Sequence, residues 1–200
     1  MAKIAVVYYS STGHVHKMAE AIQAGAESAG AEVRLRRAAE LASEDVIRSQ
    51  DAWHEHYVAT KDTVPEVSND DFEWADGYAL GTPTRYGLPT SQLKQAIDMT
   101  GPLWGAGKLA NKVATSFTSA QNTHGGQEST ILALNNIFYH WGAIIVPPGY
   151  VDPLLFAAGG NPYGASWPTG DGSTELSDEL RAAVELQGRR LAEYAAKLTA

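Results

Sequence analysis

The stretch "KIAVVYYSSTGHVHKMAEAIQAGAESAG", residues 3–30, decides the fold. It begins with an apolar run over residues 3–9, which is typical of a strand buried on both faces of a sheet. From about Gly13 onward its apolar residues recur at a 3,4 spacing, which predicts a helix. Between the two lies a loop that contains three hydroxyl side chains and a glycine, Ser10 to Gly13, and neither Lys nor Arg.

The same alternation of strand and helix patterns continues along the chain. Further strands are predicted at residues 31–37, 75–83, 112–117 and 142–146, and further helices at 91–99, 125–141 and 176–199. Strands that alternate with helices imply right-handed crossovers and a parallel sheet with helices on both faces. We therefore predict one α/β domain over residues 1–200, built on a five-stranded doubly wound sheet.

Two long segments lie outside this minimal pattern and are predicted to be insertions. Residues 42–74 are polar and only partly helical in pattern. In residues 147–172, 11 of 26 positions are Gly or Pro, with scattered Tyr, Leu, Phe and Trp. A structureless loop of that length is unusual in a compact domain, so we expect the second segment to pack on a neighbouring subunit.

Composition excludes several classes of protein. The 200 residues have a net charge of −8 and no cluster of Lys and Arg, so we predict no binding to nucleic acid. The chain has no cysteine, which excludes disulfides and thiolate metal sites and fits a reducing compartment. No apolar stretch approaches the roughly 18 residues of a membrane span. From these features we expect a cytoplasmic protein.

Three loops that follow predicted strands are rich in hydroxyl groups or glycine, at residues 10–15, 81–90 and 116–128. In a doubly wound sheet the loops at the carboxyl ends of the strands meet at the ligand site. A helix N-terminus behind hydroxyl groups can hold a phosphate without a cationic side chain, although the same residue types also form ordinary helix N-caps. The first loop has no Lys after its glycine and no G-x-G-x-x-G pattern, so it is neither a P-loop nor a dinucleotide fingerprint.

The first loop resembles the phosphate loop of flavodoxins. Four other motifs resemble the WrbA family, namely "GTPTRYG" (81–87), "GPLW" (101–104), "HGGQE" (124–128) and "GNPYGAS" (160–166). This family consists of flavodoxin-like, FMN-dependent NAD(P)H:quinone oxidoreductases, first named as tryptophan-repressor-binding proteins. The resemblance covers nearly the whole chain and is weakest over residues 42–74. It implies the flavodoxin strand order 2-1-3-4-5, a homotetramer, and two-electron reduction of quinones by NADH or NADPH.

The resemblance also implies where the ligands bind. FMN would contact residues of all three loops and one histidine, and these are Ser10, Ser11, Thr12, Gly13, His14, Val15, Pro83, Thr84, Arg85, Tyr86, Thr118, Ser119, Ala120, Gln121, Asn122, Thr123, His124, Gly125 and His140. Trp104 would lie over the flavin and form the substrate slot. The nicotinamide and the quinone would use this slot in turn, in a ping-pong reaction. The redox chemistry belongs to the cofactor, so no catalytic side chain is assigned.

Several alternatives remain open at this point. Without the resemblance, His140 in its helix is more typical of a core or capping histidine, whereas Arg85 could equally belong to a solvated loop. The pairs His54/His56 and His14/His16 have no third ligand, so we predict solvated faces and no metal site. A flavodoxin-type carrier of single electrons would share the FMN loops, and it is the alternative to an enzyme.

Overall fold

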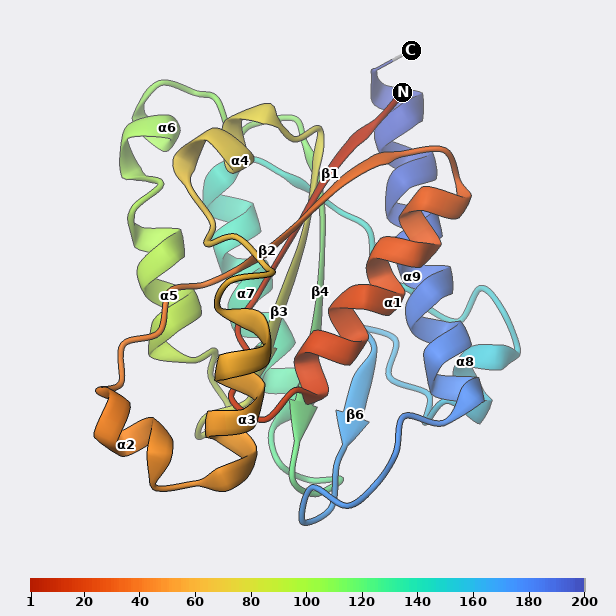
Figure 1. The fold of residues 1–200 in the computed structure, drawn as a ribbon. Coiled ribbons are helices and arrows are strands. Elements are labelled where there is room, and N and C mark those ends of the chain that lie inside the picture. Colours follow the sequence, from red (N-terminus) through yellow and green to blue (C-terminus); the bar gives the residue numbers. More distant parts are fainter. Residues whose placement is uncertain (200) are drawn as a thin grey trace.

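The computed structural model describes residues 1–199. It contains a parallel sheet with helices packed on both faces (Figure 1). Five strands lie in the order β2-β1-β3-β4-β5, all parallel, which confirms the predicted order. Their bounds are β1 Lys3–Tyr8, β2 Glu32–Arg37, β3 Gly77–Pro83, β4 Val113–Ala120 and β5 Ile144–Ile145. The bounds of each strand lie within three residues of its predicted range.

Helices cover both faces of the sheet. On one face α1 (His14–Ser28) packs beside the final helix α9 (Asp178–Leu198), and on the other lie α5 (Ser91–Asp98) and α7 (Gln127–Trp141) (Figure 1). The two helices of the first pair approach closely through glycine. A Cβ atom on Gly25 would lie 1.9 Å from the carbonyl oxygen of Glu185, and one on Gly188 2.1 Å from that of Ile22. Only glycine permits this contact between α1 and α9.

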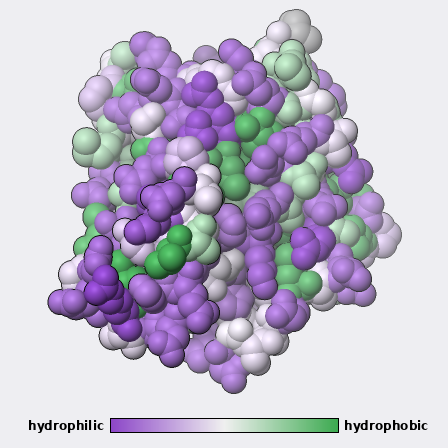
Figure 2. All heavy atoms as spheres, viewed as in Figure 1, coloured by the Kyte–Doolittle hydropathy of each residue, from purple (hydrophilic) through white to green (hydrophobic). Residues whose placement is uncertain are grey.

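The segment predicted as a polar insertion, residues 42–74, forms three short helices. These are α2 (Glu44–Arg48), α3 (Asp51–Thr60) and α4 (Asn69–Trp74). Helix α3 lies beside the start of α1, in front of the sheet in Figure 1. Figure 2, in the same view, shows mainly hydrophilic residues over α1 and α3, with apolar residues in small separate patches.

The segment 147–172 differs from the prediction. It contains a short helix, α8 (Leu154–Ala157), and a sixth strand, β6 (Ser166–Pro168), which pairs in parallel with the last residues of β4. Leu155 and Trp167 are buried within their own chain, so these two residues of the segment do not need a neighbouring subunit to cover them. Tyr150 and Phe156 remain exposed and stack on each other, with ring centroids 4.8 Å apart.

Helix α6 (Gly101–Gly105) follows α5 and lies at the amino-terminal edge of the sheet, far from the ends of β1 and β3 (Figure 1). Among residues 1–199, none of the helices is both long enough and apolar enough to cross a lipid bilayer.

Candidate functional site

A cavity of about 830 Å³ opens at the carboxyl ends of the strands. The three loops singled out in the sequence all contribute to its wall, through Ser10, Ser11, Thr12, His14, Val15, Pro83, Thr84, Arg85, Tyr86, Ser119, Ala120, Gln121, Asn122 and Gly125. The cavity lies where the chain leaves β1 and β3 for helices on opposite faces of the sheet, which is the position where doubly wound folds bind ligands. Its volume is in the range of small-molecule sites.

The first loop leaves the start of helix α1 open. Gly13 precedes the helix in the left-handed region, with φ of 90° and ψ of −14°, and no side chain caps the helix. The amide of Gly13 donates a hydrogen bond to the Ser10 hydroxyl at 3.1 Å. The ordinary N-cap interpretation of this loop is therefore wrong. The first amides of α1 and the positive end of its dipole are available to an anion.

Thr84 fastens the second loop to the third. Its amide donates to the carbonyl of Ser119 at 2.8 Å, and its hydroxyl lies 3.4 Å from the carbonyl of Gly125 and 2.7 Å from the hydroxyl of Thr130. Gly87 and Gly126, both at positive φ, pass so closely that a Cβ on Gly126 would lie 2.8 Å from the Gly87 Cα. These contacts give the two loops a fixed relative position.

Arg85 and Tyr86 form the outer edge of the cavity. The guanidinium of Arg85 lies 3.5 Å from the hydroxyl of Ser11, so the second loop brings a cation to the first, which has none of its own. Tyr86 is fully exposed and has a φ of 54°. A non-glycine residue at positive φ is uncommon, and an exposed aromatic ring held in this way is available for contact with a ligand.

Two further segments, which were not predicted from the sequence, also line the cavity. Gln50 and Ala52 come from the first turn of α3 and the residue before it, and Thr169 to Gly172 follow β6. The second segment is preceded by a strand of three residues that ends in proline, too short for a period-2 pattern. Its sequence "TGDG" was the available signal, because Gly-rich turns after strands mark this edge of the sheet.

Some residues assigned to the cofactor lie outside this cavity wall. Thr118 is buried, and its hydroxyl donates to the carbonyl of Thr82 at 2.6 Å, so it supports the loops from behind. Thr123 lines a separate cavity of about 360 Å³ beside β6, and His124 is exposed at the tip of the third loop.

Trp104 and His140 lie together, but at the amino-terminal end of the strands and not at the carboxyl end. The indole Nε1 of Trp104 donates to the carbonyl of His140 at 2.8 Å, and both line a cavity of about 290 Å³ between α5, α6 and the end of α7. Trp104 is 57% exposed. Within one chain the structure therefore does not bring these two residues to the loops of the large cavity.

Three histidines gather around the first loop. The Tyr8 hydroxyl lies 2.5 Å from Nδ1 of His16, whose ring centroid is 5.3 Å from that of His56 on α3. The prediction of solvated faces is wrong for His16 and His56, which lie partly buried between helices. Burial lowers the pKa of His56 to about 4, and the nearby His16 and His14 add to this shift. The ring of His56 is therefore neutral at pH 7.

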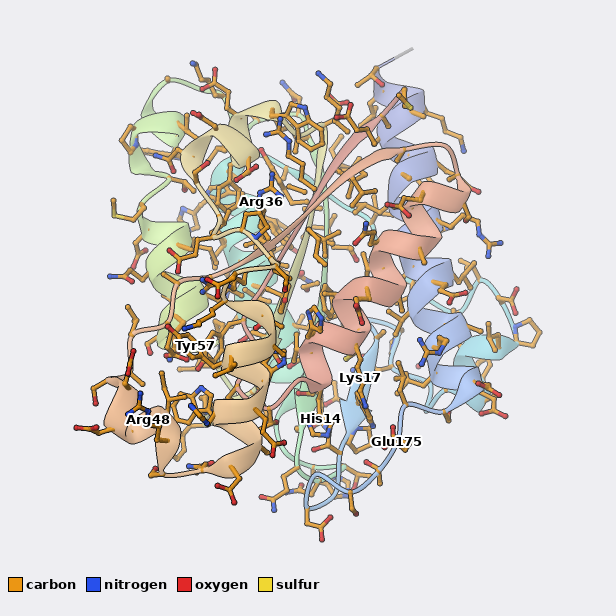
Figure 3. The ribbon with its side chains drawn as sticks, in the orientation of Figure 1. His14, Lys17, Arg36, Arg48, Tyr57 and Glu175 are labelled. Carbon is orange, nitrogen blue, oxygen red and sulfur yellow. The ribbon has the colours of Figure 1, made fainter. Side chains whose placement is uncertain are left out.

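His14 lies in the first turn of α1, above the loop that follows β6 (Figure 3). Its ring meets the edge of Trp167 at a centroid distance of 4.8 Å, and its Nδ1 lies 3.0 Å from the Thr12 hydroxyl. Burial lowers the pKa of His14. In the part of the chain that the structure describes, no three His, Asp or Glu side chains converge as a metal site would require.

Comparison with known proteins gives consistent results. Residues 2–152 match the family described as "NADPH-dependent FMN reductase". A protein of Deinococcus radiodurans named "NAD(P)H dehydrogenase (quinone)" is 48% identical over 98% of this chain and 96% of its own length. A Sinorhizobium fredii protein of the same name is 44% identical over 99% of both chains.

Among solved structures, a WrbA-like flavodoxin from Agrobacterium tumefaciens aligns with a TM-score of 0.68 and 26% identity, over 98% of this chain and 99% of its own. A flavodoxin from the domain Archaea aligns with a TM-score of 0.64 and 18% identity, over 97% and 99% of the two chains. The second similarity, at this low identity, concerns the fold alone.

Proposed function

This chain belongs to the NADPH-dependent FMN reductase family, and we propose that it is an FMN-dependent oxidoreductase that reduces quinones with NADH or NADPH. The observation that carries the proposal is the large cavity at the strand ends, with an uncapped helix N-terminus at one end and three loops around it. The relatives that match over nearly their full length are named for this activity.

The groups in the cavity fit FMN. The phosphate of FMN is a dianion that accepts hydrogen bonds only, and the first loop offers helix amides and the hydroxyls of Ser10, Ser11 and Thr12. The wall formed by Pro83 to Tyr86 and by Ser119 to Asn122 suits a planar ring system with polar edges. When bound, FMN supplies the transfer of two electrons, while the protein orients the reactants and excludes water.

The proposal includes a homotetramer in which neighbouring chains complete each cavity. Trp104 lies too far along the molecule to reach the large cavity of its own chain, yet its exposed ring suits a stacking role. The exposed stack of Tyr150 and Phe156 is an apolar surface of the kind that subunits cover. We assign Trp104 and His140 to a slot shared between subunits, where nicotinamide and quinone bind in turn.

Two further parts of the proposal concern the chain as a whole. Residues 1–200 form one domain, which the continuous sheet and the packing of α9 on α1 support. The protein works in the cytoplasm, and its lack of cysteine fits a reducing compartment.

The test is a titration of the apoprotein with FMN and FAD, followed by an assay with NADH or NADPH and benzoquinone. We expect tighter binding of FMN than of FAD, and oxidation of the nicotinamide that requires both FMN and quinone. Binding of FMN without such turnover would instead favour a flavodoxin-type electron carrier. Tighter binding of FAD would contradict the assignment of the first loop.

A further inference from the structure

The ring of His56, on helix α3, lies close to the first loop. The three atoms nearest to the Cβ position of Gly13 all belong to His56, and the closest is Nδ1 at 3.4 Å. A Cβ atom added at Gly13 would be in ordinary van der Waals contact with this ring, so the imidazole faces the side-chain position of the one left-handed residue of the loop.

The position of His56 is fixed from the other side by a chain of contacts. The Tyr8 hydroxyl is protonated, since burial raises its pKa, and it lies within hydrogen-bond distance of Nδ1 of His16. The other ring nitrogen of His16, Nε2, lies 3.4 Å from the carboxylate of Glu20, which favours a proton on Nε2. His16 is thereby oriented between β1 and α1, and its ring in turn packs against His56.

Helix α3 itself is held to the sheet by Glu40. This carboxylate accepts hydrogen bonds from the Trp53 indole at 3.1 Å, the Tyr9 hydroxyl at 2.8 Å and the Gln92 amide at 2.9 Å. Burial alone would raise the pKa of Glu40, but the amide of Ala42 and the other donors lower it overall, so the group is ionised. Charge-assisted hydrogen bonds of this kind are strong, so α3 has a defined position.

A loop that binds an anion through backbone amides works best when its conformation is already set before binding. Ordering a flexible loop costs free energy that is subtracted from affinity, and rigid packing avoids this cost. Gly13 has the widest conformational freedom of any residue in the loop, so it is the place where a packing contact has most effect.

We propose that His56 is a positioning residue for the phosphate of FMN. Its imidazole packs on Gly13 and holds the first loop in the conformation that binds a phosphate monoester. This inference rests on the proposed function. It gives the segment 42–74 a role in cofactor binding, through a contact of shape rather than of charge.

The experiment compares FMN with riboflavin, which lacks the phosphate, by quenching of flavin fluorescence in titrations of apoprotein. For His56→Ala and His56→Gln we expect the dissociation constant of FMN to rise about tenfold, with that of riboflavin nearly unchanged. His56→Phe should restore most of the affinity, because it keeps a planar ring. The matched control is His54→Ala, on the same helix, which lines a different cavity with Lys61.

A second measurement needs no cofactor. Hydrogen exchange of the amides of residues 11–15 in the apoprotein should be faster in His56→Ala than in the wild type or His54→Ala. The inference is overturned if the ratio of FMN to riboflavin affinity is the same in all variants, or if His56→Gln restores binding and His56→Phe does not. A wild type that binds FMN no better than riboflavin would contradict the proposed function itself.

Discussion

At the scale of single residues, the first loop offers a bound anion mainly groups without a formal charge. Its own donors are hydroxyls and helix amides, the neighbouring histidine His56 is neutral at pH 7, and only Arg85 brings a cation, at 3.5 Å from Ser11. Recognition in such a site depends on geometry, because each donor must point at the anion. Small changes at one residue are therefore expected to affect binding of the phosphate specifically.

Thr12→Ala should weaken binding of FMN by roughly 1 kcal/mol, about fivefold, because one hydrogen bond to the phosphate is lost. The hydroxyl of Thr12 lies at the cavity wall and is oriented by Nδ1 of His14 at 3.0 Å. Thr12→Ser keeps the hydroxyl and should bind FMN nearly as the wild type does. Isothermal titration with FMN and riboflavin measures both constants, and an equal loss for the two flavins would argue against a phosphate contact.

His56 should also make the apoprotein sensitive to acid. Its pKa is lowered from 6.5 to about 4 in the fold, first by burial and then by His16 and His14. Because the unfolded chain binds the proton more readily, the free energy of unfolding falls as the pH falls from 6.5 toward 4, and is unaffected above 6.5. When the free energy of unfolding is measured with urea, His56→Gln should show a smaller fall in it between pH 7.5 and pH 5. Identical pH profiles for the two proteins would contradict this prediction.

At the scale of elements, the short strand β6 fixes one wall of the cavity. It pairs with the last residues of β4 and places Trp167, 2% exposed, beneath the loop of residues 169–172. The buried indole also meets the ring of His14 from the first loop. Through this one aromatic side chain, β6 connects the third loop, which follows β4, to the first loop.

Trp167→Ala should lower the free energy of unfolding by about 3–5 kcal/mol, the usual cost of removing a large buried aromatic residue. Tyr139→Ala, which removes an aromatic residue that is 69% exposed on α7, should cost about 1 kcal/mol or less. Urea unfolding of the two apoproteins gives the comparison. Equal losses would mean that β6 is not part of the stable core.

The elements that could be predicted from the sequence are those whose pattern repeats. The apolar runs of β1 and β3 and the 3,4 spacing of α1 each extend over at least one full strand or several turns. β6 was missed because three residues carry no period, and α3 because its apolar residues form no stripe. The contacts of His56 with Gly13 and His16 join residues far apart in the chain, and no local pattern encodes them.

At the scale of the whole molecule, the two groups of residues assigned to the reaction lie at opposite edges of the sheet. The loops of the large cavity follow β1, β3 and β4, whereas Trp104 and His140 lie where α5 and α7 end. A single chain thus cannot bring Trp104 over its own cavity, but symmetric association can bring one edge of a chain to the other edge of its neighbour. This is why the proposed activity needs an oligomer.

The proposed arrangement can be tested by mixing two defective chains. Trp104→Ala keeps the first loop but loses the stacking ring, and should reduce kcat/KM for quinone about tenfold. Gly13→Val should not bind FMN, because a β-branched residue is strained at a φ of 90° and meets His56, but it keeps Trp104. Refolding the two chains together, each with a different affinity tag, yields mixed oligomers that can be purified over both tags.

In these mixed oligomers, FMN is bound only by chains that lack Trp104. If Trp104 acts on the cavity of a neighbour, about half of these cavities receive it from a Gly13→Val chain, and quinone turnover per bound FMN rises well above that of Trp104→Ala alone. The control replaces the second chain by the double variant Gly13→Val with Trp104→Ala, which has no indole to contribute and should give no recovery. Turnover per FMN that stays at the Trp104→Ala level in both mixtures would mean that Trp104 does not complete a neighbouring site, and light scattering on the same samples would show whether an oligomer forms at all.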